Sequence, residues 1–274
     1  MNATVATPSE TSSSMNLTVA AQMTGADFLK LRKKRGILIW SLVLALVPLL
    51  VLFIVRALLH SSSPSEHGPA GGTDGFTQAI RLLGLIFGPL AAILIGAEAG
   101  AGDQSAGVFR DLVTTGRSRV ALFASRVPAA LLVMLSITLL GYLITIAGTY
   151  LFADSLPTPS FGLLLEGLGF VLLADGVICV VAVGFGSLTT SKAATITALI
   201  GWHLVASPLI ASITYLGRSR DFILSQALVH FSPVRLGDRG ANITMAGATA
   251  LLILVLWLGV FLALGAWRTR TMDA

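Results

Sequence analysis

The sequence has little cysteine, little charge and few aromatic residues. Cys179 is its only cysteine and lies within an apolar run, which excludes an internal disulfide and a cysteine-rich metal site. Charged residues make up 11% of the 274 residues and hydrophobic residues 55%, a balance far more apolar than that of a soluble domain. The composition is that of an integral membrane protein.

Three motifs of enzyme active sites are absent as well. No G-x-x-x-x-G-K-[ST] loop occurs, and the glycine-containing stretch 184–192 does not fit it, so the chain should not bind ATP by such a loop. His60, His67, His203 and His230 are scattered without a His-Glu-x-x-His pair, and there is no G-x-S-x-G elbow. We therefore expect no metal site and no bound cofactor on this chain, and the sequence does not favour an enzyme.

Long apolar runs dominate what is present. About 20 residues at about 1.5 Å each cross the hydrocarbon core, and these runs lack the alternation of barrel strands. We therefore predict an all-α integral membrane protein with a six-helix transmembrane domain over residues 37–267. The expected spans are residues 37–59, 77–97, 127–152, 161–185, 193–215 and 243–267.

The flanks of this domain differ from it in composition. Residues 1–25 are Ser/Thr-rich without an apolar core, which predicts a disordered cytoplasmic tail. Residues 26–36 place Phe28 and Leu31 among five Lys and Arg, as in an interfacial amphipathic helix. The positive-inside rule then makes this end cytoplasmic, and an even number of spans returns the short tail 268–274 to the same side. We expect a multi-pass protein of the plasma or inner membrane with both termini in the cytoplasm.

The basic residues mostly flank the apolar spans, where they would meet anionic lipid headgroups rather than nucleic acid. Of the 18 Lys and Arg, we place twelve on the inner side and six on the outer side. The bias supports this topology, although four arginines in the outer segment 216–242 oppose it. That segment is too polar to span but contains apolar residues, so we expect it to be semi-buried in the outer leaflet.

A charged connector, residues 98–126, lies between the second and third spans. Glu98 stands where the second span ends, and either headgroup solvation or a salt bridge to the basic N-terminal helix would account for it. Small residues at Gly84, Gly88, Ala92 and Gly96 recur every four positions of the second span, a spacing that suits close helix packing.

Two ionisable residues within spans are candidates for function. Asp175 is either a substrate or proton site facing the bundle interior or a hydrogen-bonded packing residue beside Gly176. His203, beside Trp202, is more often a core histidine than a substrate ligand.

In the connector, the run from Asp103 to Arg119 resembles the permease subunits of type-2 ABC exporters. Those subunits carry an acidic residue, then Gly-Thr, then Leu, then Pro-x-Ser-Arg. The matching residues are Asp103, Gly107, Leu112, Ser118 and Arg119, whereas Val108 replaces the usual Thr and Gly116 stands where Pro is commoner. The order of elements is similar too: a basic helix, six spans, the connector after the second span and an outer segment before the sixth.

The resemblance implies a permease that forms a dimer with a second copy or a paralogue. Its connector would hold a coupling helix that docks on a separate ABC ATPase subunit, where ATP and Mg are bound. The spacing of Phe109, Leu112 and Val113 fits one helix face filling an apolar groove, with charges at its rim; the alternative is an amphipathic helix lying on lipid. The predicted coupling residues are Asp103, Gly107, Phe109, Arg110, Leu112, Val113, Gly116, Arg117 and Arg119.

By family analogy, spans two and five of both protomers line the translocation path. The candidate lining residues are Gly84, Gly88, Ala92, Asp175, Thr195, Thr197 and His203. Because aromatic residues make up only 7% of the chain, an amphipathic or hydrophobic cargo such as a drug, lipid or peptide is favoured over a polysaccharide. The leading hypothesis is thus an export permease. The alternatives are a non-transporting membrane interaction or assembly protein on the same scaffold, and an intramembrane enzyme centred on Asp175 or Glu166.

Overall fold

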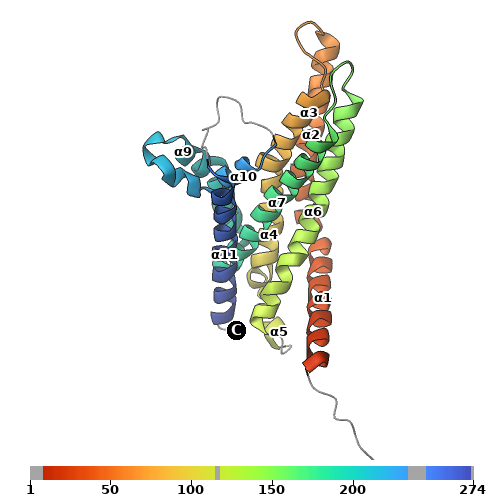
Figure 1. Cartoon of the computed structure of the whole chain (residues 1–274). Coiled ribbons are helices and arrows are strands. Elements are labelled where there is room, and N and C mark those ends of the chain that lie inside the picture. Colours follow the sequence, from red (N-terminus) through yellow and green to blue (C-terminus); the bar gives the residue numbers. More distant parts are fainter. Residues whose placement is uncertain (1–8, 115–117, 234–244, 273–274) are drawn as a thin grey trace, which may run out of the picture.

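The computed structural model describes residues 9–114, 118–233 and 245–272, and every regular element within these ranges is a helix (Figure 1). Within the described residues, six helices are long and apolar enough to cross a membrane. They are Arg35–Ser62, Gly72–Ser105, Arg119–Leu151, Phe161–Thr189, Lys192–Ser212 and Gly247–Thr271. The predicted all-α fold with six spans is therefore confirmed.

Spans two and five each contain a π-helical turn near a proline, and short helices lie in the connections between spans. The elements in order are α1 (Ser9–Lys33), α2 (Arg35–Ser62), α3 (Gly72–Arg81), η1 (Leu82–Phe87), α4 (Gly88–Ser105), α5 (Phe109–Thr114), α6 (Arg119–Leu151), α7 (Phe161–Thr189), α8 (Lys192–Gly201), η2 (Trp202–Ala206), α9 (Ser207–Ser212), η3 (Thr214–Phe222), α10 (Leu224–His230) and α11 (Gly247–Thr271). Span two consists of α3, η1 and α4, and span five of α8, η2 and α9.

The N-terminal region differs from the sequence expectation. We predicted disorder through residue 25 and a separate helix over 26–36, but one helix, α1, begins at Ser9 and ends at Lys33. Residues 1–8 lie outside the described part of the chain. The polar composition of this region gives little intrinsic helix stability, and packing of α1 along α6 supplies it (Figure 1). The helix breaks at Lys34, whose ψ of 68° is not helical, and α2 begins at the next residue.

The centre of the bundle is the contact between α4 and α7. A Cβ added to Gly96 would lie 2.5 Å from the Ala182 Cβ, and one added to Gly100 would lie 2.3 Å from the Val183 carbonyl oxygen. The absence of side chains at these glycines therefore lets the two backbones approach closely. In the most apolar window of each span, 72% of α7 is buried but only 11% of span five. Spans two and four thus form the core, and span five lies at the periphery.

At the end of the bundle away from α1, two loops are joined through their backbones. The Gly71 amide donates to the Phe152 carbonyl at 2.7 Å, and the Thr73 amide donates to the Pro157 carbonyl at 2.9 Å. Gly72 takes a φ of +67°, which suits glycine because it has no Cβ. The connection between spans one and two is therefore packed against the connection between spans three and four.

Span six packs along α7, whereas the α9 end of span five projects away from the bundle (Figure 1). Thr190, which follows α7, has a left-handed φ of 59° and turns the chain into α8. Between spans five and six, α10 packs against α11 and buries Leu224, Ala227 and Leu228. These residues belong to the segment expected to be semi-buried, and its part over 234–242 lies outside the described residues.

Candidate functional site

The strongest polar cluster lies at the end of the bundle that carries α1, α5 and the end of α11. At its centre is Asp103, near the end of α4 and only 2% exposed. Lys30 of α1 forms an ion pair with Asp103 Oδ1, and Arg126 Nη2 of α6 lies 3.1 Å from Asp103 Oδ2. A buried carboxylate needs such partners because burial without them costs several kcal/mol. One side chain therefore joins three helices.

Arg126 is the second centre of this cluster. It is 2% exposed and donates from Nη1 to the Gly100 carbonyl at 3.2 Å. Its guanidinium also lies over the Phe109 ring, 5.7 Å from the centroid. The same Gly100 carbonyl accepts a hydrogen bond from Ser187 of α7 at 3.1 Å, so span four is tied in as well.

Glu98 forms a second ionic centre one and a half turns before Asp103. Its Oε1 lies 3.5 Å from Lys34 Nζ, at the junction of α1 and α2, and its Oε2 lies 3.1 Å from Lys192 Nζ, at the start of α8. Of the two alternatives that the sequence left open, the salt bridge to the basic N-terminal region is confirmed. Span five is therefore linked to span one through a single carboxylate of span two.

The connector between spans two and three is shorter than residues 98–126, because α4 continues to Ser105 and α6 begins at Arg119. Gly107 ends α4 in a Schellman motif: the Val108 amide donates to the Asp103 carbonyl at 3.0 Å, and the Gly107 amide donates to the Gln104 carbonyl at 3.1 Å. The φ of +73° at Gly107 favours glycine. The glycine of the family-like motif therefore turns the chain out of α4 and into α5.

Phe109 differs from its predicted role. We expected its ring on the outer face of the connector, but it is 5% exposed and packs beneath Arg126. The reason is that an aromatic face offers the buried guanidinium a favourable contact, which turns this residue towards the bundle. Among the described side chains of the connector, the apolar ones that reach the surface are Val108, just before α5 and 41% exposed, and the half-buried Leu112.

Four other predicted coupling residues can be described only in part or not at all. Arg110 and Val113 lie in α5, but their side chains are outside the described residues, as are Gly116 and Arg117 altogether. Arg119 is described: its Nη1 donates to the Met272 carbonyl and lies 3.5 Å from the Arg270 carbonyl. A cation at the last carbonyls of a helix is favourable, so Arg119 ties the start of α6 to the end of α11.

The small residues predicted to line a path face span four of the same chain instead. A Cβ on Gly84 would lie 2.6 Å from the Phe170 ring, one on Gly88 would lie 2.5 Å from Asp175 Oδ1, and Ala92 is fully buried. The close helix packing predicted from their spacing is confirmed. Within one protomer these residues therefore do not line an open path.

Asp175 is fully buried between α4, α6 and α7. Thr138 of α6 donates to its Oδ2 at 2.7 Å, and the Gly88 backbone lies against its Oδ1. Oδ1 has no hydrogen-bond partner among the described residues, so both alternatives for Asp175 stay open.

The three candidates of span five lie in different surroundings. Thr195 is buried and hydrogen-bonded to Thr189 at 2.7 Å, whereas Thr197 is exposed on the bundle surface. His203 Nε2 lies 2.9 Å from the Leu85 carbonyl of span two. Pro89 has no N–H to donate to that carbonyl in an α-helical register, so the histidine takes its place.

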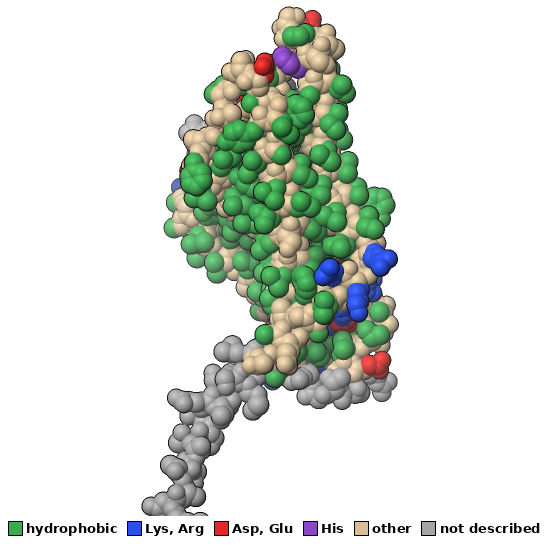
Figure 2. Space-filling model, turned by 90° about the vertical axis from the view of Figure 1, so that its right-hand side faces the viewer, with side chains coloured by type: hydrophobic (Ala, Val, Ile, Leu, Met, Phe, Trp, Pro, Cys, Tyr) green, Lys and Arg blue, Asp and Glu red, His purple; other side chains and the backbone are tan. Residues whose placement is uncertain are grey.

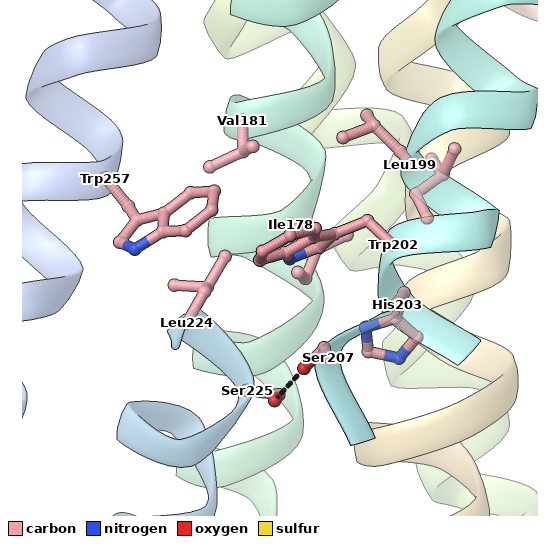
Figure 3. Close-up of a pocket in the computed structure, with 10 residues that line it drawn as sticks. Ile178, Val181, Leu199, Trp202, His203, Ser207, Leu224, Ser225 and Trp257 are labelled. Atoms are coloured by element: carbon pink, nitrogen blue, oxygen red, sulfur yellow. Dashed lines mark hydrogen bonds between the residues drawn. The ribbon is translucent and has the colours of Figure 1, made fainter. Parts of the chain in front are cut away.

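His203 also lines the apolar pocket drawn in Figure 3. Trp202 and Trp257 come towards one another from spans five and six, with ring centroids 6.0 Å apart. On the other side of the pocket, Ser207 and Ser225 share a hydrogen bond of 2.6 Å (Figure 3). The Ser207 and Ser225 hydroxyl groups, His203 Nε2 and Trp257 Nε1 therefore already have partners within the chain.

A family model for ABC-2 family transporter proteins matches residues 25–201. The chain belongs to this family. The match runs from α1 through the end of α8, so it includes both ionic centres and the whole connector. No curated protein matched the chain. Membrane subunits of ABC-2 transporters are generally non-catalytic and act with ATPase subunits, which agrees with the missing phosphate-binding loop.

Sequence reasoning missed most of the polar cluster of this ABC-2 protein. Asp103 was singled out, but Lys30, Arg126 and Lys192 were not. One signal was available: Arg126 stands between apolar residues near the start of a span, where a charge is costly unless it is paired. Its partners, Asp103 and Gly100 of α4 and Phe109 of α5, are distant in sequence, so only the fold reveals them.

Proposed function

We propose that this ABC-2 permease is the membrane subunit of an ATP-driven exporter and is coupled to a separate ATPase subunit through α5. ATP and Mg would be bound and hydrolysed on that partner. The permease would act as a dimer with a second copy or a paralogue, in a plasma or inner membrane with both termini in the cytoplasm. An amphipathic or hydrophobic cargo, such as a drug, lipid or peptide, suits the low aromatic content.

The observation that carries this proposal is the position of Asp103. It lies four residues before the turn at Gly107, and its two ion pairs join α4 to α1 and α6 at the base of α5. A displacement of α5 is therefore transmitted directly to α4 and α6, which it connects, and through Lys30 to α1. Glu98 extends the same linkage to α8. Such rigid polar connections suit a lever between an ATPase and the spans.

Docking on the partner would use the outer surface of α5. Because Phe109 packs inward, we assign the apolar contact to Val108 and Leu112. An aspartate at either position would place an unpaired charge in an apolar groove of the partner, which weakens binding by at least about tenfold. Phe109→Asp would instead disturb the fold, because its ring is buried beneath Arg126.

The test is affinity purification of the tagged chain in mild detergent, with the amount of co-purifying ATPase measured by mass spectrometry. We expect near-equal stoichiometry with the wild type and at least a tenfold loss with Val108→Asp and Leu112→Asp. Ser65→Asp, an exposed position in the loop between spans one and two, is the matched control and should retain the partner. Full retention by both α5 variants would refute docking through α5. A folded wild type without any ATPase would favour the interaction-protein alternative.

A further inference from the structure

Six consecutive positions, Lys30 to Arg35, contain five basic side chains that divide into two sets. Lys30 and Lys34 pair with the buried carboxylates of Asp103 and Glu98. The other three, Arg32, Lys33 and Arg35, are exposed, and none of them forms an ion pair with a described residue. A set of cations is therefore left to interact with something outside the chain.

An apolar groove begins beside this outward set. Arg32 and Phe28 of α1 stand at one end, Leu38 and Leu42 of α2 form one wall, and α6 forms the other. The residues of α6 are Val133, Ser136, Ile137 and Leu140, whose spacing of i, i+3, i+4 and i+7 places them on one helix face. The groove contains about 540 Å³ of empty space, part of it open to the surroundings.

The groove exists because the chain breaks at Lys34. Straight continuation of α1 into α2 would leave no offset between the two helices, and the non-helical ψ of 68° at Lys34 provides it. Along α6 the groove extends from Val133 to Leu140, or about 10 Å at about 1.5 Å per residue. Its length and apolar walls suit an alkyl chain, and Arg32 in its lining suits an anionic group.

We propose that this groove binds one anionic phospholipid, with its phosphate at Arg32, where Lys33 and Arg35 add exposed positive charge nearby in the sequence, and one acyl chain against α2 and α6. Charge complementarity identifies the headgroup, because three unpaired cations favour a negative group at the membrane surface. Figure 2 shows Lys and Arg side chains gathered at the border of a broad hydrophobic surface, which is where a phospholipid changes from headgroup to acyl chain. The proposal does not depend on export or on the ATPase.

A second copy of the chain fits this surface less well than a lipid. A two-fold contact here would bring two sets of the same unpaired cations together, and like charges facing each other are unfavourable. A free phosphate would satisfy the cations but leave the apolar groove empty. A phospholipid satisfies both parts of the surface at once.

The test measures lipid binding to the full chain, with any attached subunits, by native mass spectrometry in mild detergent. Phosphatidylglycerol and phosphatidylcholine with identical acyl chains are titrated, and the Kd of each is determined. We expect tighter binding of phosphatidylglycerol, and Arg32→Gln should weaken it roughly fivefold because one basic residue near a lipid surface contributes a factor of about this size. Lys33→Gln also removes one exposed cation and replaces Arg32→Gln in the test should that variant fail to fold.

Two further variants separate the headgroup from the acyl chain. Ser136→Trp fills the groove from an exposed position without changing charge, and should also weaken phosphatidylglycerol binding. Arg268→Gln removes an exposed cation of α11 outside the groove and should leave binding unchanged. Soluble glycerol phosphate in excess should not displace the lipid.

Several outcomes would overturn the proposal. Equal affinity of the wild type for the two lipids would show that the site does not recognise an anionic headgroup. A loss of affinity with Arg268→Gln as large as that with Arg32→Gln would show that only the overall charge of the protein matters. Displacement of the lipid by glycerol phosphate would assign the cations to a free anion. A lower dimer fraction with unchanged lipid binding in Ser136→Trp would assign the groove to a second copy.

Discussion

Replacing Arg126 by Met should destabilise the bundle more than any single charge removal at its surface. The substitution keeps an unbranched apolar side chain but removes the ion pair to Asp103 at 3.1 Å and the hydrogen bond to the Gly100 carbonyl at 3.2 Å. Breaking a buried pair by removing one partner costs about 3–5 kcal/mol, because the other charge is left without compensation. Asp103 keeps Lys30, whose side chain is 40% exposed, so we expect about 3 kcal/mol.

The assay is thermal unfolding of the full chain in detergent. For a chain of this size about 1 kcal/mol corresponds to about 2–4 °C, so Tm should fall by about 6–12 °C. Arg268→Met, at an exposed position of α11, is the matched control and should change Tm by less than about 2 °C. A similarly small change for Arg126→Met would refute the assignment of this ion pair as a main contact of the bundle.

The double variant Arg126→Met with Asp103→Leu tests whether the effect is that of a pair. Each single variant leaves a buried charge with one partner fewer: Asp103 keeps only Lys30, and Arg126 keeps the Gly100 carbonyl but no carboxylate. The double variant removes both buried charges and leaves Lys30 able to turn to solvent. The double variant should therefore be more stable than the sum of the two single losses predicts. Additive losses would mean that the two side chains act separately.

Two further predictions concern the core of the bundle. Gly96→Leu should prevent close packing of α4 on α7 and lower both yield and Tm, because a Cβ added at Gly96 would lie 2.5 Å from a neighbouring side chain. Gly169→Leu is the control, since nothing lies within 4 Å of its Cβ position. An equal loss of yield and Tm in both variants would contradict the packing explanation. Thr138→Val should lower stability by about 1 kcal/mol, measured as Tm, by removing the hydroxyl group that donates to Asp175 at 2.7 Å, whereas Thr138→Ser should retain it. Equal stability of the Val and Ser variants would show that this hydrogen bond contributes nothing.

The number and order of the spans could be predicted from the sequence because hydropathy and length decide membrane insertion almost locally. The close packing along Gly84, Gly88 and Ala92 was also predictable, since a four-residue spacing of small residues specifies one helix face. The helix that this face contacts could not be predicted, and the sequence analysis assigned the same residues to the translocation path. The partner, α7, is chosen by the three-dimensional arrangement rather than by spacing.

The connector shows the same limit on a smaller scale. Phe109 and Leu112 were placed on one face of a short helix, and α5 begins at Phe109 as that pattern requires. Periodicity gives the face but not its direction, and Arg126, seventeen residues later in sequence, turns Phe109 inward. The helical start of α1 at Ser9 was missed for a related reason, because contact with α6 overrides a weak local propensity.

The uneven burial of the spans divides the bundle into a closely packed core, spans two and four, and a loosely packed span five. Spans two and four pack closely through glycines of α4. The loops beyond them are joined by backbone hydrogen bonds, so we expect the two spans to move as one rigid body. Span five is held to them by only a few polar contacts among the described residues, chiefly Lys192 with Glu98 and His203 with the Leu85 carbonyl. Rotation about Thr190 would exchange those contacts while leaving the core intact. Moving span five past spans two and four would therefore disrupt fewer packed contacts than separating those two spans.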